Sequence, residues 1–387
     1  MVDVKRPRMR PPVKREEIVE YFREKIISGE LQPGEPLPTR EEARLKFKTG
    51  SVTVQKTFDI LAEQGFITTV PGHLSVVSEN LPHKNRIAVV IPGSGDLLKN
   101  RFFLSLLHVV EKKQVPSSYE FVPYLVNILR SEEENDDSQR LVDDVASRSL
   151  KGVILSTSPT IEDARLRKIQ DRCPVILLSK ADDGPSCRLI VDHYVSFFEE
   201  AVKLARQTGG RRIALFLNSI ISDKYMEGIM KLIAGNGLET RNEWIHGFNI
   251  SESKWAANVA RLLFSQDKPG RPDTLFVMDD NLVEAVSASL CEIKDLTPDD
   301  LTVIAHANYP EIVPSCFPAY RIGFDVSKIL LKGAEMIDRL ASNPKVKICE
   351  SIKAVRLPQN NIPRVDSSAS TSKYSIKKNI LLKMEEK

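Results

Sequence analysis

The sequence of 387 residues has no apolar run long enough to cross a membrane. A membrane span needs about 20 predominantly apolar residues in a row. The first stretch, MVDVKRPRMRPPVKR, has basic residues with no apolar segment behind them, which is not the pattern of a secretory signal. We therefore expect a cytoplasmic protein that does not act at a membrane.

Clustered metal ligands and redox motifs are also missing. The five cysteines form no CxxC pair, and the six histidines form no HExxH motif. We expect reduced, mostly buried cysteines, no metal and no cofactor.

Catalytic motifs are equally scarce. The pair Gly93 and Gly95 begins a dinucleotide fingerprint, but Leu98 stands where its third glycine belongs. No P-loop, GxSxG elbow or kinase motif occurs. Asp279 and Asp280 could be paired acid and base, but neighbours on a strand point to opposite faces. We therefore predict that the chain is not an enzyme and has no catalytic residue.

Positive charge is concentrated at the N-terminus. The net charge of +3 does not define a partner, but residues 1–13 are rich in Lys, Arg and Pro and hold one acidic residue, Asp3. Such a basic arm suits a phosphate backbone. A solvated tail that aids solubility is the alternative.

Composition and hydropathy divide the rest of the chain. Residues 14–78 are charged and helix-rich, and residues 79–84 are a polar linker. Residues 85–358 alternate apolar strand-like runs with amphipathic helical runs. Residues 359–387 are polar and Ser-rich at first, and we expect them to be disordered.

The pattern of residues 14–78 predicts a winged helix-turn-helix. Apolar residues at helical spacing predict a first helix from about Arg15 to Ser28. Thr39 and Glu42 form a capping-box pattern that begins a second helix. A third helix begins near Ser51, and two extended runs around Pro71-Gly72-His73 predict a β-hairpin.

In a helix-turn-helix the N-terminal end of the recognition helix meets the base edges in the major groove. The candidate base and phosphate contacts on the third helix are Ser51, Val52, Thr53, Gln55 and Lys56. Gln can read adenine, Lys can hold guanine or phosphate, and hydroxyls can serve either. At the tip of the wing, Gly72 allows close backbone approach and His73 lies beside it.

This head resembles the GntR-type winged helix. The resemblance rests on matching residues at fixed spacing: Gly29, Leu31, Pro33, Gly34, Leu37, Pro38, Arg40, Thr53, Val54, Leu61, Gly65 and Gly72. It implies DNA contacts by Arg40 and the adjacent Thr39; a surface salt bridge to nearby glutamates is the alternative for Arg40. Gly50-Ser51 replaces the family's Ser-Arg and Leu74 replaces a wing glycine, which affects operator contacts rather than the fold.

Strands that alternate with helices across residues 85–358 predict an α/β domain with parallel sheets and covered faces. The pattern restarts near Asp192, which indicates two lobes. We place the first at about 85–183 and 324–345 and the second at about 184–323 and 346–358. Ligands bind at the carboxyl ends of such strands, so the effector is expected between the lobes.

The order of these runs resembles the LacI-type effector domain, which is itself similar to periplasmic sugar-binding proteins. The matching landmarks include Gly152-Val-Ile-Leu, Gly210-Arg-Arg-Ile-Ala-Leu, Asp279-Asp280 and Leu301-Thr-Val-Ile-Ala. A GntR-type head on a LacI-type sensor is the combination found in arabinose-responsive regulators.

The resemblance implies an effector site. The family's Asn-Asp pair corresponds to Asp279-Asp280, so Asp280 is the expected hydrogen-bond acceptor for sugar hydroxyls. Tyr225 stands where the family has an Arg. The other candidates are Phe102, Phe103, Ser156 and Ser158. Core packing is the alternative for the aromatic residues, and plain exposure for the adjacent carboxylates.

Together these observations predict a sequence-specific transcription regulator, by resemblance a repressor that a sugar or related effector controls. We expect a homodimer on an inverted-repeat operator, because a two-fold protein reads a two-fold site. The alternative is a regulator whose sensor has lost ligand binding and serves dimerisation only. The remaining alternative is an enzyme, which the sequence supports least.

Overall fold

The computed structural model describes residues 14–69, 74–93, 100–126, 137–156, 169–179, 187–219, 221–265 and 270–357. The basic arm 1–13, the wing-tip residues Gly72 and His73, Ser158 and the tail 359–387 lie outside these ranges. The chain divides into two compact units. The first holds residues 1–94, 107–189 and 330–350, and the second holds residues 95–106, 190–329 and 351–387.

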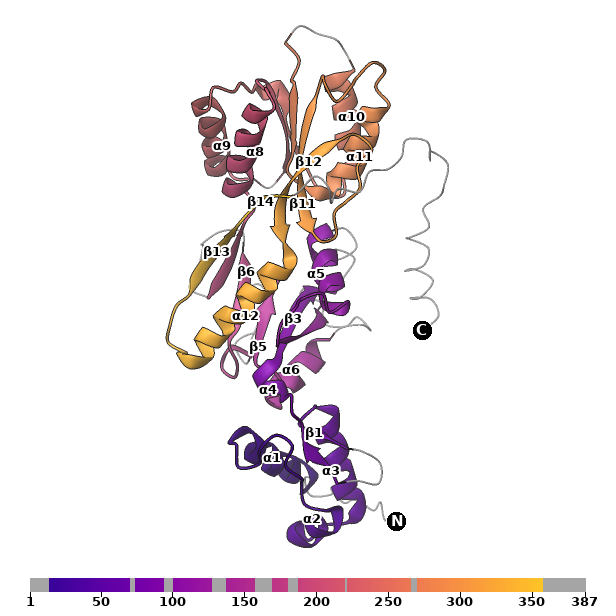
Figure 1. Cartoon of the computed structure of the whole chain (residues 1–387), viewed down its shortest axis with the longest axis vertical. Coiled ribbons are helices and arrows are strands. Elements are labelled where there is room, and N and C mark those ends of the chain that lie inside the picture. Colours follow the sequence, from indigo (N-terminus) through magenta and orange to yellow (C-terminus); the bar gives the residue numbers. More distant parts are fainter. Residues whose placement is uncertain are drawn as a thin grey trace, which may run out of the picture. The chain divides into compact units, whose positions relative to one another are not determined.

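The head is a winged helix-turn-helix, as predicted (Figure 1). Its elements are α1 (Lys14–Ile27), α2 (Arg40–Phe47), α3 (Ser51–Glu63), β1 (Ile67–Thr68) and β2 (Val76–Val77). β1 and β2 pair antiparallel, with Ile67 opposite Val77. Phe22 of α1 and Phe58 of α3 meet edge to face at 5.8 Å in the buried core, which explains the apolar spacing of both helices.

A short helix, α4 (Pro82–Asn85), joins the head to the first sheet. In order across the sheet the strands are β13 (Cys349–Lys353), β7 (Arg188–Asp192), β6 (Val175–Ser179), β5 (Gly152–Leu155), β3 (Arg86–Pro92) and β4 (Glu120–Val126). β3 pairs in parallel with β4 and β5, and β5 with β6. The helices α5 (Arg101–Glu111), α6 (Ser138–Ala146) and α12 (Val326–Ser342) alternate with these strands along the chain. α12 lies so close to β5 that a Cβ on Gly152 would meet Ile337 at 2.6 Å.

The second sheet has the order β14 (Val355–Arg356), β12 (Ala319–Asp325), β11 (Thr302–Tyr309), β10 (Thr274–Val277), β8 (Ile213–Asn218) and β9 (Ile245–Phe248). All its pairs are parallel except β12 with β14. The helices of this unit are α8 (Val195–Gln207), α9 (Asp223–Gly235), α10 (Ser253–Phe264) and α11 (Asp280–Cys291), with the 3-10 turn η2 (Asn242–Trp244). Leu275 and Val277 of β10 belong to a buried hydrophobic core between this strand and the helices α10 and α11. The predicted α/β class with parallel sheets is confirmed.

The predicted lobe boundaries separate two short strands from the sheet in which they pair. Residues 188–192 and 349–353 fall in the predicted second lobe, and β7 and β13 pair in the first sheet, although residues 190–192 and 351–353 belong to the second compact unit. The restart of the strand–helix pattern near Asp192 marks a repeat along the chain. This repeat does not indicate which of the two sheets a connecting strand joins.

The cysteines are free, but the prediction that they are mostly buried is wrong. Cys291, Cys316 and Cys349 are exposed and the other two are half-buried. Cys349 begins β13, the edge strand of its sheet, where one side of the strand has no neighbour. Among the described residues, no helix combines the length and apolar character that a membrane span requires.

Candidate functional site

The N-terminal half of α3 presents the side chains expected to contact DNA. Ser51, Val52, Gln55 and Lys56 are exposed, and Thr53 is half-buried. Val52 has 67% of its surface exposed, which is unusual for a branched apolar residue and suits contact with a thymine methyl group. Val54, Phe58 and Leu61 occupy the opposite, buried face, so the hydrophobic core fixes which residues α3 displays.

The first turn of α3 has no side-chain cap. Its N-cap residue is Gly50, which offers no hydrogen-bonding side chain to the first amide groups. Free N–H groups at a helix N-terminus attract anions such as phosphate. This end of α3 therefore combines apolar, amide and cationic groups suited to a DNA groove and its flanking backbone.

Arg40 lies beside the recognition helix. Its Nε donates a hydrogen bond of 2.6 Å to Oε1 of Gln55, and its guanidinium lies 5.2 Å from the ring centre of Phe58. The amide of Gln55 in turn donates to Oδ1 of Asp59 at 2.7 Å. Two expected DNA contacts from different helices are thus brought together. Arg40 forms no ion pair with the nearby glutamates among the described residues, whereas Arg44 binds Glu41.

Thr39 is the N-cap residue of α2. Its Oγ1 accepts a hydrogen bond of 3.2 Å from the backbone N–H of Glu42, and the Glu42 carboxylate accepts one of 2.8 Å from the N–H of Thr39. This is the capping box that the sequence predicts. The hydroxyl is engaged at the start of α2, so a DNA contact by this residue would use its remaining donor.

A second cluster of polar groups lies in the second unit around Asp280. This residue begins α11, is 4% exposed, and its Oδ2 accepts a hydrogen bond of 2.8 Å from the amide of Asn308. Nδ1 of His306 lies 3.9 Å from Oδ1, close enough for an ion pair when the ring is protonated. His306 and Asn308 alternate along β11 and therefore share one face of the sheet.

Arg321 on β12 is also buried, with 1% of its surface exposed. Its Nη2 donates to the carbonyl oxygen of Val313 at 2.8 Å, whereas Nε and Nη1 have no hydrogen-bond partner among the described residues. Burial lowers the pKa of Arg321 to about 10, and the negative charge of Asp280 opposes that shift. Asp280 is thus the counter-charge of a buried cation.

Aromatic rings also lie near His306. The His193 ring lies 5.3 Å from that of His306 and 4.7 Å from that of Phe324. The Phe102 ring lies 6.1 Å from His193, and Phe103 lies beside Phe102 at 5.8 Å. The cluster therefore combines a carboxylate, an amide and two imidazoles with flat aromatic rings.

Tyr225 packs on Tyr194 with ring centres 5.0 Å apart. Burial, with Tyr225 and the charge of Asp279 nearby, raises the pKa of Tyr194. Asp279 itself caps α11, because its Oδ1 accepts hydrogen bonds from the backbone and side chain of Asn281. Tyr225 and Asp279 thus both act on Tyr194, and a site shared by Tyr225 and Asp280 stays a prediction.

Ser156 follows β5 in the first unit. Its side chain is buried, and its Oγ has no hydrogen-bond partner among the described residues. The other expected residues of this site, Asp280, Tyr225, Phe102 and Phe103, belong to the second unit.

The sequence analysis missed His193, His306, Asn308, Arg321 and Phe324. The alternation of His306 and Asn308 in an otherwise apolar strand was a usable signal, since polar residues at a strand's carboxyl end commonly face a ligand. Arg321 gave no such signal, because its burial depends on tertiary packing alone. In the part of the chain that the structure describes, no group of three or more His, Cys, Asp or Glu could hold a metal ion.

Comparison with known proteins gives relatives for both parts of the chain. Residues 14–77 match the bacterial regulatory proteins of the gntR family. The arabinose metabolism transcriptional repressor of Geobacillus stearothermophilus is 20% identical over 368 residues, which cover 85% of this chain and 95% of that protein. The mannosyl-D-glycerate transport/metabolism system repressor MngR of Escherichia coli (strain K12) is 35% identical over 63 residues, which cover 16% of this chain and 26% of that protein.

Solved structures of LacI family regulators share the fold of the larger part. A regulator from Lactobacillus casei with bound glucose matches with a TM-score of 0.50 and 18% identity, covering 71% of this chain and 98% of that one. A putative LacI regulator from Bacillus cereus subsp. cytotoxis matches with a TM-score of 0.50 and 17% identity, covering 70% and 96%. The chain thus combines a GntR-type head with a LacI-type fold.

Proposed function

We propose that this chain is a transcription repressor that binds operator DNA through its winged head and responds to a sugar. The observation that carries the proposal is the α3 surface, where Val52, Gln55 and Lys56 are exposed beside Arg40 within the segment that matches gntR regulators. The arabinose repressor that covers most of the chain supports the same role. The sugar-bound LacI-type relative supports a sugar as the effector.

The repressor acts as a homodimer on an inverted repeat. Trp255 and Leu262 lie two turns apart on α10 and are 57% and 71% exposed. Large apolar side chains that share an exposed face are typical of surfaces that a partner covers. A two-fold dimer would place two α3 helices on two half-sites. The protein works by binding rather than by catalysis, and in the cytoplasm, where bacterial operators are.

The sugar binds the second unit next to Asn308, His306 and Tyr225. Its binding changes operator affinity through a difference in sugar affinity between two states of the protein. A neutral sugar would use the free Oδ1 of Asn308 and Nε2 of His306, both buried without a partner among the described residues.

A gel-shift titration with DNA from upstream of the protein's own gene tests the head. Arg40→Ala should weaken binding about tenfold, because one base or phosphate contact contributes about 1–3 kcal/mol. Arg44→Ala is the matched control, since its guanidinium is already bound to Glu41. If the protein shifts no DNA, or if both variants lose the same binding affinity, the proposed interface is contradicted.

A thermal-shift screen with arabinose, glucose and sucrose tests the sensor. Tyr225→Ala should remove the stabilisation that the best sugar gives, while the melting temperature without sugar changes little because Tyr225 is half-buried. The alternative, a sensor that has lost its ligand, draws on one observation: Asp280 is already bonded to Asn308 and buried. It is favoured if no sugar raises the melting temperature of the unaltered protein.

A further inference from the structure

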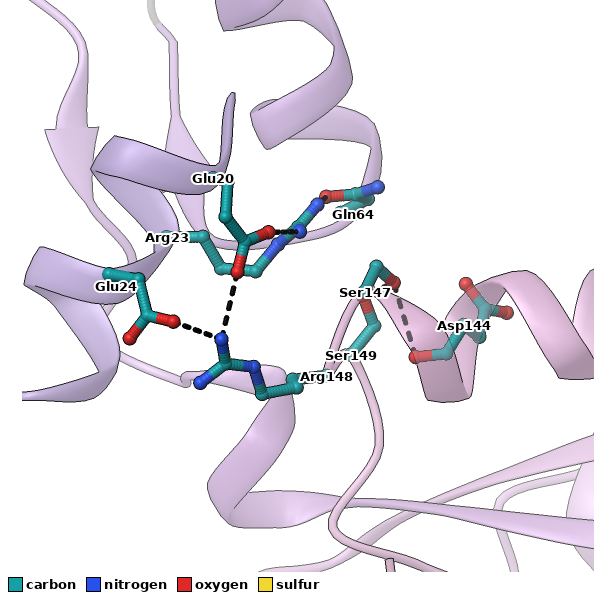
Figure 2. A network of polar contacts seen from close by, with 8 residues as sticks. All are labelled: Glu20, Arg23, Glu24, Gln64, Asp144, Ser147, Arg148 and Ser149. Atoms are coloured by element: carbon teal, nitrogen blue, oxygen red, sulfur yellow. Dashed lines mark hydrogen bonds and ion pairs between the residues drawn. The ribbon is translucent and has the colours of Figure 1, made fainter. Parts of the chain in front are cut away.

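A polar junction joins the head to the first sheet's domain, within the first unit (Figure 2). Arg148 follows α6, and its Nη2 donates to Oε1 of Glu20 at 2.8 Å and to the carboxylate of Glu24. Both glutamates are on α1 of the head, one turn apart. The partners are 128 and 124 residues apart in the sequence, so only the folded chain brings them together.

The turn that carries Arg148 is tightly fixed. Arg148 has a φ of 54°, in the left-handed region that residues with a side chain rarely adopt. Around it, Ser147 Oγ donates to the carbonyl of Asp144 at 3.1 Å and lies 2.7 Å from Ser149 Oγ, and the N–H of Ser149 binds the same carbonyl. A strained residue persists where its surroundings determine it, and such residues concentrate at functional contacts. The turn therefore holds the guanidinium toward α1.

On the head side, the junction reaches the recognition helix. Arg23 is 7% exposed, bonds to Glu20, and donates to Oε1 of Gln64 at 2.8 Å. Gln64 is the C-cap residue of α3. The backbone carbonyl of Gln64 also accepts a hydrogen bond of 3.5 Å from Arg86, the first residue of β3. The Arg86 side chain in turn forms an ion pair of 3.0 Å with Glu120 of β4. One chain of contacts therefore links α1, the end of α3 and the first sheet.

The helix α6 connects this junction to the other end of the first sheet. At its N-terminus, the Asp137 carboxylate accepts a bond of 2.8 Å from the N–H of Leu125, close to the carboxyl end of β4. In parallel sheets, the carboxyl ends of the strands are where ligands bind. A rearrangement at that edge would move a helix whose far end bears Arg148.

The strength of the contacts suits a reversible connection. Arg148, Glu20 and Glu24 have side chains that are 42%, 45% and 51% exposed. Ion pairs this accessible to solvent are weak singly and are screened by salt. The bond from Arg148 nevertheless lowers the pKa of Glu24, so the carboxylate is charged at neutral pH.

We propose that Arg148 with Glu20 and Glu24 is the docking contact by which the sensor orients the DNA-binding head. The partner surface is the acidic side of α1 in the same chain. Docking holds the head in the orientation that fits the operator, so operator affinity depends on it. This second statement rests on the proposed function, whereas the docking contact itself does not.

Hydrogen exchange of the full-length protein without DNA or sugar tests the docking. Arg148→Glu should raise the exchange of α1 near Glu20 and of the 147–149 turn together, and adding Glu24→Arg, which leaves the Glu20–Arg23 pair intact, should restore protection. Arg172→Glu is the control, an exposed arginine of the same unit for which the described residues show no side-chain hydrogen bond or ion pair. Unchanged exchange in Arg148→Glu, or no recovery in the charge-swapped protein, overturns the docking contact.

Operator titration then tests its consequence. Arg148→Ala should raise the operator Kd about two- to fivefold at low salt, with a smaller change at high salt, and Arg172→Ala should leave it unchanged. Altered exchange with an unchanged Kd would overturn the orienting role and leave a structural contact. If the unaltered protein binds no operator, the proposed function fails and so does the orienting role, while exchange still decides the docking contact.

Discussion

The head and the Asp280 cluster use polar residues in opposite ways. In the head, Ser51, Gln55 and Lys56 are exposed on one side of a helix whose other side is core. In the cluster, Asp280, His306, Asn308 and Arg321 are all buried, and Asp280 accepts a hydrogen bond from Asn308 and lies near the rings or charges of the other two. An exposed polar residue costs the fold little and is available to a partner, whereas a buried one must be satisfied inside.

Removal of the buried cation should therefore have the largest effect. We expect Arg321→Met to lower the free energy of unfolding of the second unit by about 1–3 kcal/mol, because the buried carbonyl oxygen of Val313 loses its donor and Asp280 loses a nearby positive charge. Tryptophan fluorescence in a urea titration reports this unit alone, since both tryptophans, Trp244 and Trp255, belong to it.

Two further variants separate the charge pair from simple loss of packing. Arg321→Met combined with Asp280→Asn should cost less than the sum of the single changes, since the pair is removed together. Arg261→Met is the control, because Arg261 is 42% exposed and its ion pair with Glu292 lies at the surface. Equal losses in the Arg321 and Arg261 variants would remove the distinction drawn between buried and exposed polar groups.

The same distinction decides what the sequence could predict. The bounds of α1 and the first residues of α2 and α3 fall within about one residue of the predicted positions, because a helix of the head is defined by local signals such as apolar spacing and the Thr39 capping box. The exposed candidates on α3 follow directly from that register. Local patterns also predicted the alternation of strands and helices in the larger part.

The cluster depends on contacts that local signals do not encode. Asp280 and Asn308 lie 28 residues apart and meet only because β10 and β11 are neighbours in the sheet. The family resemblance drew attention to Asp280 but not to Asn308 and Arg321 around it. The sheet membership of β7 and β13 escaped prediction for the same reason, since pairing between strands is decided by tertiary structure.

Thr39 tests whether a polar residue of the head can be structural. Thr39→Ala should destabilise α2 by about 1 kcal/mol, because the N–H of Glu42 loses its side-chain acceptor, and amide exchange in residues 40–47 should become roughly fivefold faster. Thr39→Ser keeps the oxygen and should exchange at nearly the original rate. If instead the alanine variant keeps its exchange rate but loses operator affinity, the hydroxyl serves DNA rather than the cap.

The smallest expected effect is the pH dependence of stability that His83 contributes. This residue tests whether the border of the head contains a buried titratable group like those of the Asp280 cluster. Its ring stacks on Phe66, with ring centres 6.0 Å apart and planes 17° from parallel. Burial, followed by the charges of Lys84 and Arg148, lowers the pKa of His83 below its ordinary value of 6.5. The folded head therefore binds this proton less readily than the unfolded chain does.

The sign of the pH dependence follows. The stability linked to His83 is fully present above pH 6.5, and is lost as the pH falls through the lower folded pKa. Protection factors of the head, corrected for intrinsic exchange, should fall as the pH is lowered below 6.5, and His83→Phe should flatten that fall while keeping the stack on Phe66. His246→Phe is the control: the pKa of His246 is also lowered by burial, but it lies in the second unit, so only that unit's protection should respond. A head whose pH dependence is the same with and without His83 would show that its stability depends on permanently charged and exposed groups, in contrast to the buried cluster.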